Sequence, residues 1–118
     1  MTLKLSHIEN AGNLETERVV FQAKSDLSLG KYLVLQGKKS PDGGVYSGII
    51  PAAFWFITMD VKRDDIIVLY SKSGVQSQKQ AVSEGSTSYF FYWGLSSAVW
   101  TAEFKPVAVL AATWEWTA

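Results

Sequence analysis

The single histidine, His7, is the side chain best suited to proton transfer near neutral pH. Alternating apolar and polar residues at the amino terminus predict a strand that places His7 on the side of Leu3 and Leu5, partly buried. No G-x-S-x-G nucleophile motif accompanies it. The simpler interpretation is a histidine that fills an edge-strand position. An enzyme that combines His7 with a lone acid such as Asp60 or Glu103 is the least favoured of three functional hypotheses.

The acidic residues form one local cluster, made of Asp60, Asp64 and Asp65. A hard cation needs several oxygen ligands that converge on one point, but Lys62 and Arg63 lie between these acids. The calcium-loop pattern D-x-[DN]-x-[DN]-G is absent, and the sequence has no cysteine to bind zinc. We therefore interpret this charged stretch as a hairpin turn, and we expect no metal or other cofactor.

Signals for phosphate or nucleic-acid binding are weak. Neither G-x-x-x-x-G-K-[ST] nor G-x-G-x-x-G occurs, and the basic doublets are Lys38-Lys39 and Lys62-Arg63. The 11 basic and 11 acidic side chains give zero net charge, which removes the long-range field of a nucleic-acid binder. Nucleic acid is therefore not the expected partner. The second hypothesis is a β-domain that binds a small ligand or a single strand, with stacked rings and these doublets touching phosphate.

Aromatic residues are the unusual quantity, at 14% of the chain with five Trp, five Tyr and six Phe. They concentrate in two runs, Phe54–Phe56 and Tyr89–Trp93. Because successive side chains of a strand point to opposite faces, each run must place rings on both faces. One sandwich interior cannot receive both sets, so the second set either forms an exposed binding surface or is covered by the long polar loop or a neighbouring segment. The predicted anchors of that surface are Trp55, Tyr92, Trp93 and Trp100.

Eight segments show period-2 alternation or runs of β-branched and aromatic residues, which predict strands. They are residues 3–8, 17–24, 31–36, 53–58, 65–70, 88–93, 98–101 and 107–116. Turn sequences such as Pro41-Asp42-Gly43 separate them, and no helical stripe is present. The sequence therefore predicts an all-β fold, an antiparallel β-sandwich of about seven to eight strands that forms a single domain over residues 1–118.

Two stretches do not fit a simple sandwich. Residues 71–88 are polar and rich in Ser and Gln, which predicts a long surface loop. Residues 107–116 carry little polar protection, so this strand is either paired inside a sheet or an edge that pairs with another chain. The amino terminus has no long apolar run, so neither a signal peptide nor a membrane span is expected. We therefore expect a cytoplasmic protein.

Six short segments follow one another in an order that covers most of the chain. They are Val-Val-Phe at 19–21, Lys-Ser-Asp at 24–26, Leu-Gly-Lys-Tyr at 29–32, Phe-Trp-Phe at 54–56, the stretch 61–68 and the stretch 93–100. In this order they resemble the lamin-tail domain, although Tyr32 stands where that family favours Trp and Asp64-Asp65 replaces its common Gly-Asp turn. The resemblance implies an immunoglobulin-like sandwich with a non-catalytic binding role and no catalytic residues to transfer.

The first hypothesis is therefore a non-enzymatic interaction module. Its surplus aromatic surface would bind a protein partner or a second copy of the chain, which makes a homo-oligomer an expected outcome. The residues that support it are aromatic, whereas the groups that catalysis needs are scarce.

Overall fold

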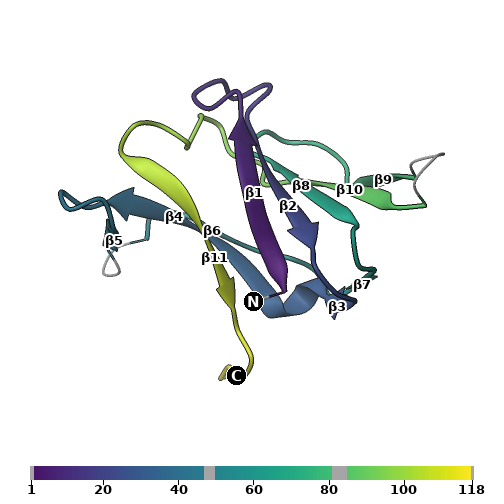
Figure 1. Ribbon diagram of the computed structural model, residues 1–118. Coiled ribbons are helices and arrows are strands. Elements are labelled where there is room, and N and C mark those ends of the chain that lie inside the picture. The colour runs from purple at the N-terminus through teal and green to yellow at the C-terminus, as the bar shows by residue number, and fades with distance from the viewer. Residues whose placement is uncertain (1, 47–49, 81–84, 118) are drawn as a thin grey trace.

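The computed structural model describes residues 2–46, 50–80 and 85–117, and in these ranges two main sheets pack against each other (Figure 1). The five-stranded sheet consists, in spatial order, of β1 (Leu3–Glu9), β2 (Arg18–Ala23), β8 (Ile66–Tyr70), β10 (Thr87–Tyr92) and β9 (Ser77–Gln80). The four-stranded sheet consists of β11 (Phe104–Leu110), β4 (Tyr32–Lys39), β5 (Val45–Tyr46) and β6 (Ala53–Trp55), with β4 paired to the other three. A small third sheet joins β3 (Leu27–Ser28) to β7 (Asp60–Val61), and a 3₁₀ turn, η1 (Leu29–Lys31), leads into β4. Within the described ranges, no helix is both long and apolar enough to cross a bilayer.

The core lies between the inner faces of the two main sheets. The predicted alternation of β2 is confirmed, since Val19, Phe21 and Ala23 are fully buried while the residues between them are half-buried. Across the sandwich, the rings of Phe21 and Phe56 meet edge to face with centroids 5.9 Å apart. Phe56 also meets Phe91 of β10 at 5.1 Å. Edge-to-face pairs add to the hydrophobic gain of burial, so these rings join the two sheets.

The prediction of a wholly antiparallel sandwich is wrong at one pair, because β10 runs parallel to β8. After β8 the chain forms β9 at the outer position and then returns as β10, which inserts between β8 and β9. A parallel pair needs a long crossover, and the polar stretch after Tyr70 supplies it. The long loop predicted at 71–88 therefore contains a strand, while its residues 81–84 lie outside the described part.

The prediction of a strand at 98–101 is also wrong, because side chains, and not a neighbouring strand, form hydrogen bonds with the backbone of Val99 in this segment. The Val99 N–H donates to Oε2 of Glu17 at 2.9 Å, and Nε2 of Gln36 donates to the Val99 carbonyl at 3.4 Å. The described residues form eleven strands, more than the seven or eight predicted. The four strands that were not predicted, β3, β5, β7 and β9, are too short to show an alternating pattern. The strand predicted at 107–116 ends at Leu110 and lies at the edge of its sheet.

Glu17 is the most unusual residue of the interior, a carboxylate with no exposed surface. Its Oε1 accepts the Gly12 N–H at 2.9 Å, and its Oε2 accepts the Ser71 hydroxyl as well as the Val99 N–H. A buried carboxylate is tolerated only when its oxygens are well hydrogen-bonded. Glu17 therefore fastens three chain segments, the β1–β2 loop, the end of β8 and the stretch before β11.

Candidate binding surface

The outer face of the four-stranded sheet carries two apolar rows, which the strand register defines. Leu33 lies opposite Trp55 on one side and Val109 on the other. Leu35 lies in the same way between Ala53 and Val107. We call this surface the Trp55 face, and its residues are Leu33, Leu35, Ala53, Trp55, Val107 and Val109.

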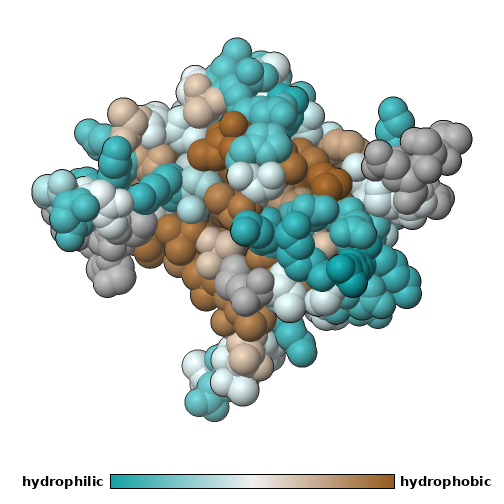
Figure 2. All heavy atoms as spheres, in the orientation of Figure 1, coloured by the Kyte–Doolittle hydropathy of each residue, from teal (hydrophilic) through white to brown (hydrophobic). Residues whose placement is uncertain are grey.

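The alternation of β4 shows that these rows face outward. Tyr32 and Val34 are buried at 3% and 0% exposure, so Leu33 and Leu35 between them point away from the core. Trp55 and Ala53 are exposed, and Trp55 keeps 45% of its surface open to solvent. Figure 2 shows hydrophobic residues gathered over β4 and β11. Neither row contains a charged or polar side chain, whereas the solvent face of an antiparallel sheet is usually polar.

Trp55 is held in one orientation by the chain before β4. Its indole Nε1 donates a hydrogen bond of 2.7 Å to the carbonyl of Gly30. A Cβ at Gly30 would come within 2.8 Å of the Thr58 Cα, so this 3₁₀ turn needs glycine to lie so close to the segment after β6. With its polar atom already paired, Trp55 presents an ordered apolar ring, and such a ring loses little conformational entropy on binding.

The segment after β11 contributes a second indole to this surface. The ring of Trp114 meets that of Trp55 edge to face with centroids 4.9 Å apart, and Trp114 is still 60% exposed. Trp116 is 79% exposed. Trp114 is absent from the four predicted anchors, and the structure ends the strand at Leu110, before this residue. The uncharged run after Lys105, followed by two Trp residues, is the signal in the sequence that marks this segment.

Of the four predicted anchors, Trp55 is the one that the structure places on this surface. Trp100 is a correction, because it is 1% exposed and lies in the core. Trp93 is half-buried and packs between Phe54 and Trp100, at centroid distances of 6.0 and 5.9 Å. Trp100 is therefore a core residue, and Trp93 directs its ring toward the same core.

Tyr92, the fourth anchor, lies on the outer face of the other sheet, where the chain's own groups surround it. Its ring stacks on Tyr70 with an interplanar angle of 10° and a centroid distance of 5.3 Å. A Cβ at Gly74 would clash with ring carbons of Tyr92, so the Gly74 backbone covers the ring. Arg18 and Lys72 lie 5.7 and 5.3 Å from the centroid of Tyr70. These contacts within the chain make the Tyr70–Tyr92 stack part of the packing of the five-stranded sheet.

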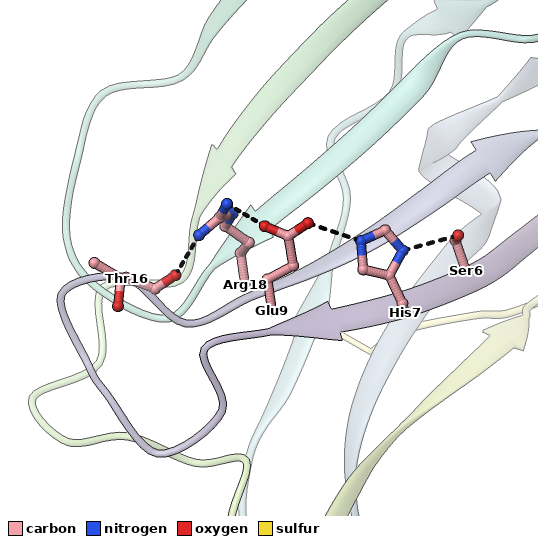
Figure 3. Close-up of polar contacts among 5 residues, drawn as sticks. All are labelled: Ser6, His7, Glu9, Thr16 and Arg18. Atoms are coloured by element: carbon pink, nitrogen blue, oxygen red, sulfur yellow. Dashed lines mark hydrogen bonds and ion pairs between the residues drawn. The ribbon is translucent and has the colours of Figure 1, made fainter.

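His7 lies in a short polar chain on β1 and β2 and is exposed, contrary to the prediction that it is partly buried (Figure 3). The register of β1 against β2 shifts between Leu5 and His7, so a β-bulge turns His7 to the solvent. Its Nε2 lies 3.0 Å from Oε1 of Glu9, its Nδ1 lies 3.0 Å from the Ser6 hydroxyl, and Arg18 pairs with Oε2 of Glu9. These contacts join near neighbours on an open sheet surface, so they fit an exposed charge network better than a reaction centre.

The Glu9 carboxylate gives this network a pH dependence. The hydrogen bond from His7, followed by the charge of Arg18, lowers the pKa of Glu9 below its usual 4.5. A lowered pKa in the folded state stabilises the protein above the unfolded value, and the stabilisation disappears as the pH falls through the folded value. We expect Glu9→Gln to lower the urea midpoint above a pH of about 4.5 and to match the unchanged protein in more acidic solution. Unfolding curves over a pH series check this, with the exposed Glu15→Gln as control, and an equal difference at every pH contradicts it.

The remaining candidate residues do not converge on a site. Asp65 is 3% exposed and accepts hydrogen bonds from the N–H groups of Lys62 and Thr87, so its role is to hold the turn before β8. Because β7 pairs with β3 and not with β8, the charged turn is a corner between sheets and not the hairpin predicted. Lys38 and Lys39 border a wide hollow of about 370 Å³ that also contains Glu103. In the described part of the chain, no group of three or more His, Cys, Asp or Glu residues is placed to hold a metal ion.

Comparisons with protein-family models, with curated proteins and with solved structures found no match. The physical character of the Trp55 face is therefore the basis on which a function is inferred.

Proposed function

We propose that this chain is a non-enzymatic protein-interaction module that binds through the Trp55 face. The observation that carries the proposal is the pair of outward apolar rows centred on Leu33 and Leu35, beside an indole fixed by Gly30. Water contact with such a surface is costly, and its removal by a partner supplies the main driving force of association. We also propose that the fold is of the immunoglobulin-like type, on the basis of the sequence resemblance and of the two facing sheets.

The chemistry of the face favours protein over a small ligand or a nucleic-acid strand. A nucleic-acid platform places cations beside exposed rings, but the rows around Trp55 contain no cation. Arg18 and Lys72 lie instead over Tyr70, whose ring is stacked on Tyr92. A buried small-ligand site is a concave pocket, whereas these rows lie on the open face of a sheet. An ordered Trp ringed by aliphatic side chains is the usual centre of a protein interface.

A photo-crosslinking experiment tests the proposal in cells that contain the protein. A photoreactive phenylalanine analogue replaces Ala53, which is exposed beside Trp55, and a control carries it at Lys4 of β1, on the outer face of the other sheet. We expect one discrete adduct from position 53 that the control does not form. The adduct is identified by mass spectrometry, and its purified partner is then titrated by calorimetry. Equal labelling from both positions contradicts the proposal.

In that titration, we expect Trp55→Ala to weaken binding about 30-fold or more, since central Trp residues of interfaces contribute at least about 2 kcal/mol. The matched control is Val75→Ala, because Val75 is 86% exposed and lies between β8 and β9. The control should bind as tightly as the unchanged protein. Unchanged affinity of Trp55→Ala would place the binding surface elsewhere.

A further inference from the structure

We infer that the chain forms a dimer with a second copy of itself, joined edge to edge through β11, so that the two Trp55 faces lie side by side as one continuous surface. This inference rests on the proposed function, because it says how the binding surface is enlarged. Four observations support it: an unpaired strand edge, the position of a proline on that edge, the uncharged character of its side chains, and an excess of exposed surface.

The open edge of β11 follows from the hydrogen bonds of β4. The Gln36 N–H donates to Ala52, on the β6 side, whereas the Lys31 carbonyl accepts from Ala111. Odd-numbered residues of β4 therefore bond to β11, and even-numbered ones bond away from it. Since Pro106 lies opposite Gln36, the even-numbered residues of β11 direct their N–H and carbonyl groups outward. Among the described residues no strand lies beyond β11.

Pro106 determines which part of this edge is usable. Proline has no N–H, and in a sheet it is tolerated where that group would point away from a neighbouring strand. The Phe104 N–H is already bonded to the Thr101 carbonyl. Ala108 and Leu110 therefore remain as consecutive outward positions with both backbone groups available to another strand.

A second copy satisfies these positions by symmetry. In an antiparallel pair centred on Val109, Ala108 of each chain exchanges two hydrogen bonds with Leu110 of the other. The two Val109 side chains then meet across the axis, at a non-hydrogen-bonded position with Cα atoms about 4.5 Å apart. Val109 belongs to the row that holds Leu33 and Trp55. The pairing thus joins two such rows into one continuous apolar band.

The side chains of residues 107–112 are uncharged, so two copies of this segment do not repel each other. The exposed area is also large for a monomer. The surface of the chain is 7299 Å², whereas a compact monomer of 13.1 kDa exposes about 6,400 Å². The excess of about 900 Å² is close to the ~800 Å² that each partner buries in a standard interface. The chain therefore exposes enough surface for an interface of standard size, and a second copy of this chain accounts for the free edge.

Light scattering after size-exclusion chromatography, over a dilution series, tests the inference. The unchanged chain should have twice the 13.1 kDa mass at the concentrated end. Val109→Lys and Val109→Glu should each be monomeric, because each places like charges directly across the axis, and an equal mixture of the two should restore the dimer. The matched control is Val75→Lys, which makes the same chemical change at an 86% exposed side chain between β8 and β9, and it should stay dimeric. Circular dichroism confirms that each variant is folded.

The outcomes separate the two proposals. A monomeric unchanged chain overturns the inference, while an adduct from position 53 with another protein would leave the proposed function in place. A dimer that Trp55→Ala abolishes overturns the edge assignment, because the contact would then lie on the Trp55 face itself. A dimer that survives both Val109 charge variants overturns it as well. Charge-specific rescue by the mixture, together with a dimeric Trp55→Ala, supports it.

Discussion

Glu17→Gln should destabilise the fold by about 2–4 kcal/mol, although the substitution replaces one oxygen by a nitrogen and leaves the shape of the side chain unchanged. Both oxygens of Glu17 accept hydrogen bonds, Oε1 from Gly12 and Oε2 from Ser71 and Val99. An amide has one acceptor oxygen, so at least one of these three donors must face an NH₂ group. A buried donor left without a partner costs about 1–3 kcal/mol, and loss of the negative charge weakens the remaining bonds.

Urea unfolding followed by tryptophan fluorescence measures this loss. The control is Glu15→Gln, which makes the same chemical change two residues away on an exposed side chain and should stay within about 0.5 kcal/mol of the unchanged protein. Equal midpoints for the two variants would mean that Glu17 does not fasten the three segments.

Phe91→Ala should cost about 3–5 kcal/mol, because it removes a buried ring from the contact between the sheets. Phe91 is 2% exposed and meets Phe56, which follows β6, and Phe54 of β6 at centroid distances of 5.1 and 6.4 Å. Its loss therefore removes the hydrophobic gain of one large side chain and leaves a cavity between β10 and β6. The same urea experiment gives the free energy of unfolding.

Phe90→Ala is the control that the alternation of β10 supplies. Phe90 is the neighbouring residue on the same strand, but its side chain points to the outer face and is half-buried. The chemical change is identical, so the difference in the free energy of unfolding between the two variants reports how much the inward position of the ring contributes. We expect less than half the loss seen for Phe91→Ala. A larger loss at Phe90 would show that the two faces of β10 are assigned the wrong way round.

Strand alternation predicted the direction of many side chains correctly. It placed Val19, Phe21 and Ala23 on a common face, and all three are fully buried. It also placed Trp55 opposite Phe54 and Phe56, and the structure has Trp55 outside and Phe56 in the core. These predictions hold because the period of two is a property of the extended backbone itself.

The same reasoning fails where one residue interrupts the period or where a side chain replaces a sheet partner. The bulge between Leu5 and His7 reverses the direction expected for the histidine. Trp100 is buried without a strand, because Glu17 and Gln36 satisfy the backbone of Val99 beside it. Neither effect is encoded within a few residues of the position concerned.

By itself, the sequence determined the all-β class, the single histidine without a nucleophile motif, and the presence of aromatic rings on both faces of two strands. The tertiary structure alone decided which of those rings are exposed to solvent. It buried Trp100, covered Tyr92 with Gly74, and placed Trp114 on Trp55. The physical reason is that alternation acts over neighbouring residues, whereas burial depends on which strands become neighbours and which edges stay open. The arrangement of the strands depends on contacts between segments far apart in the chain, such as the hydrogen bond between Glu17 and Val99.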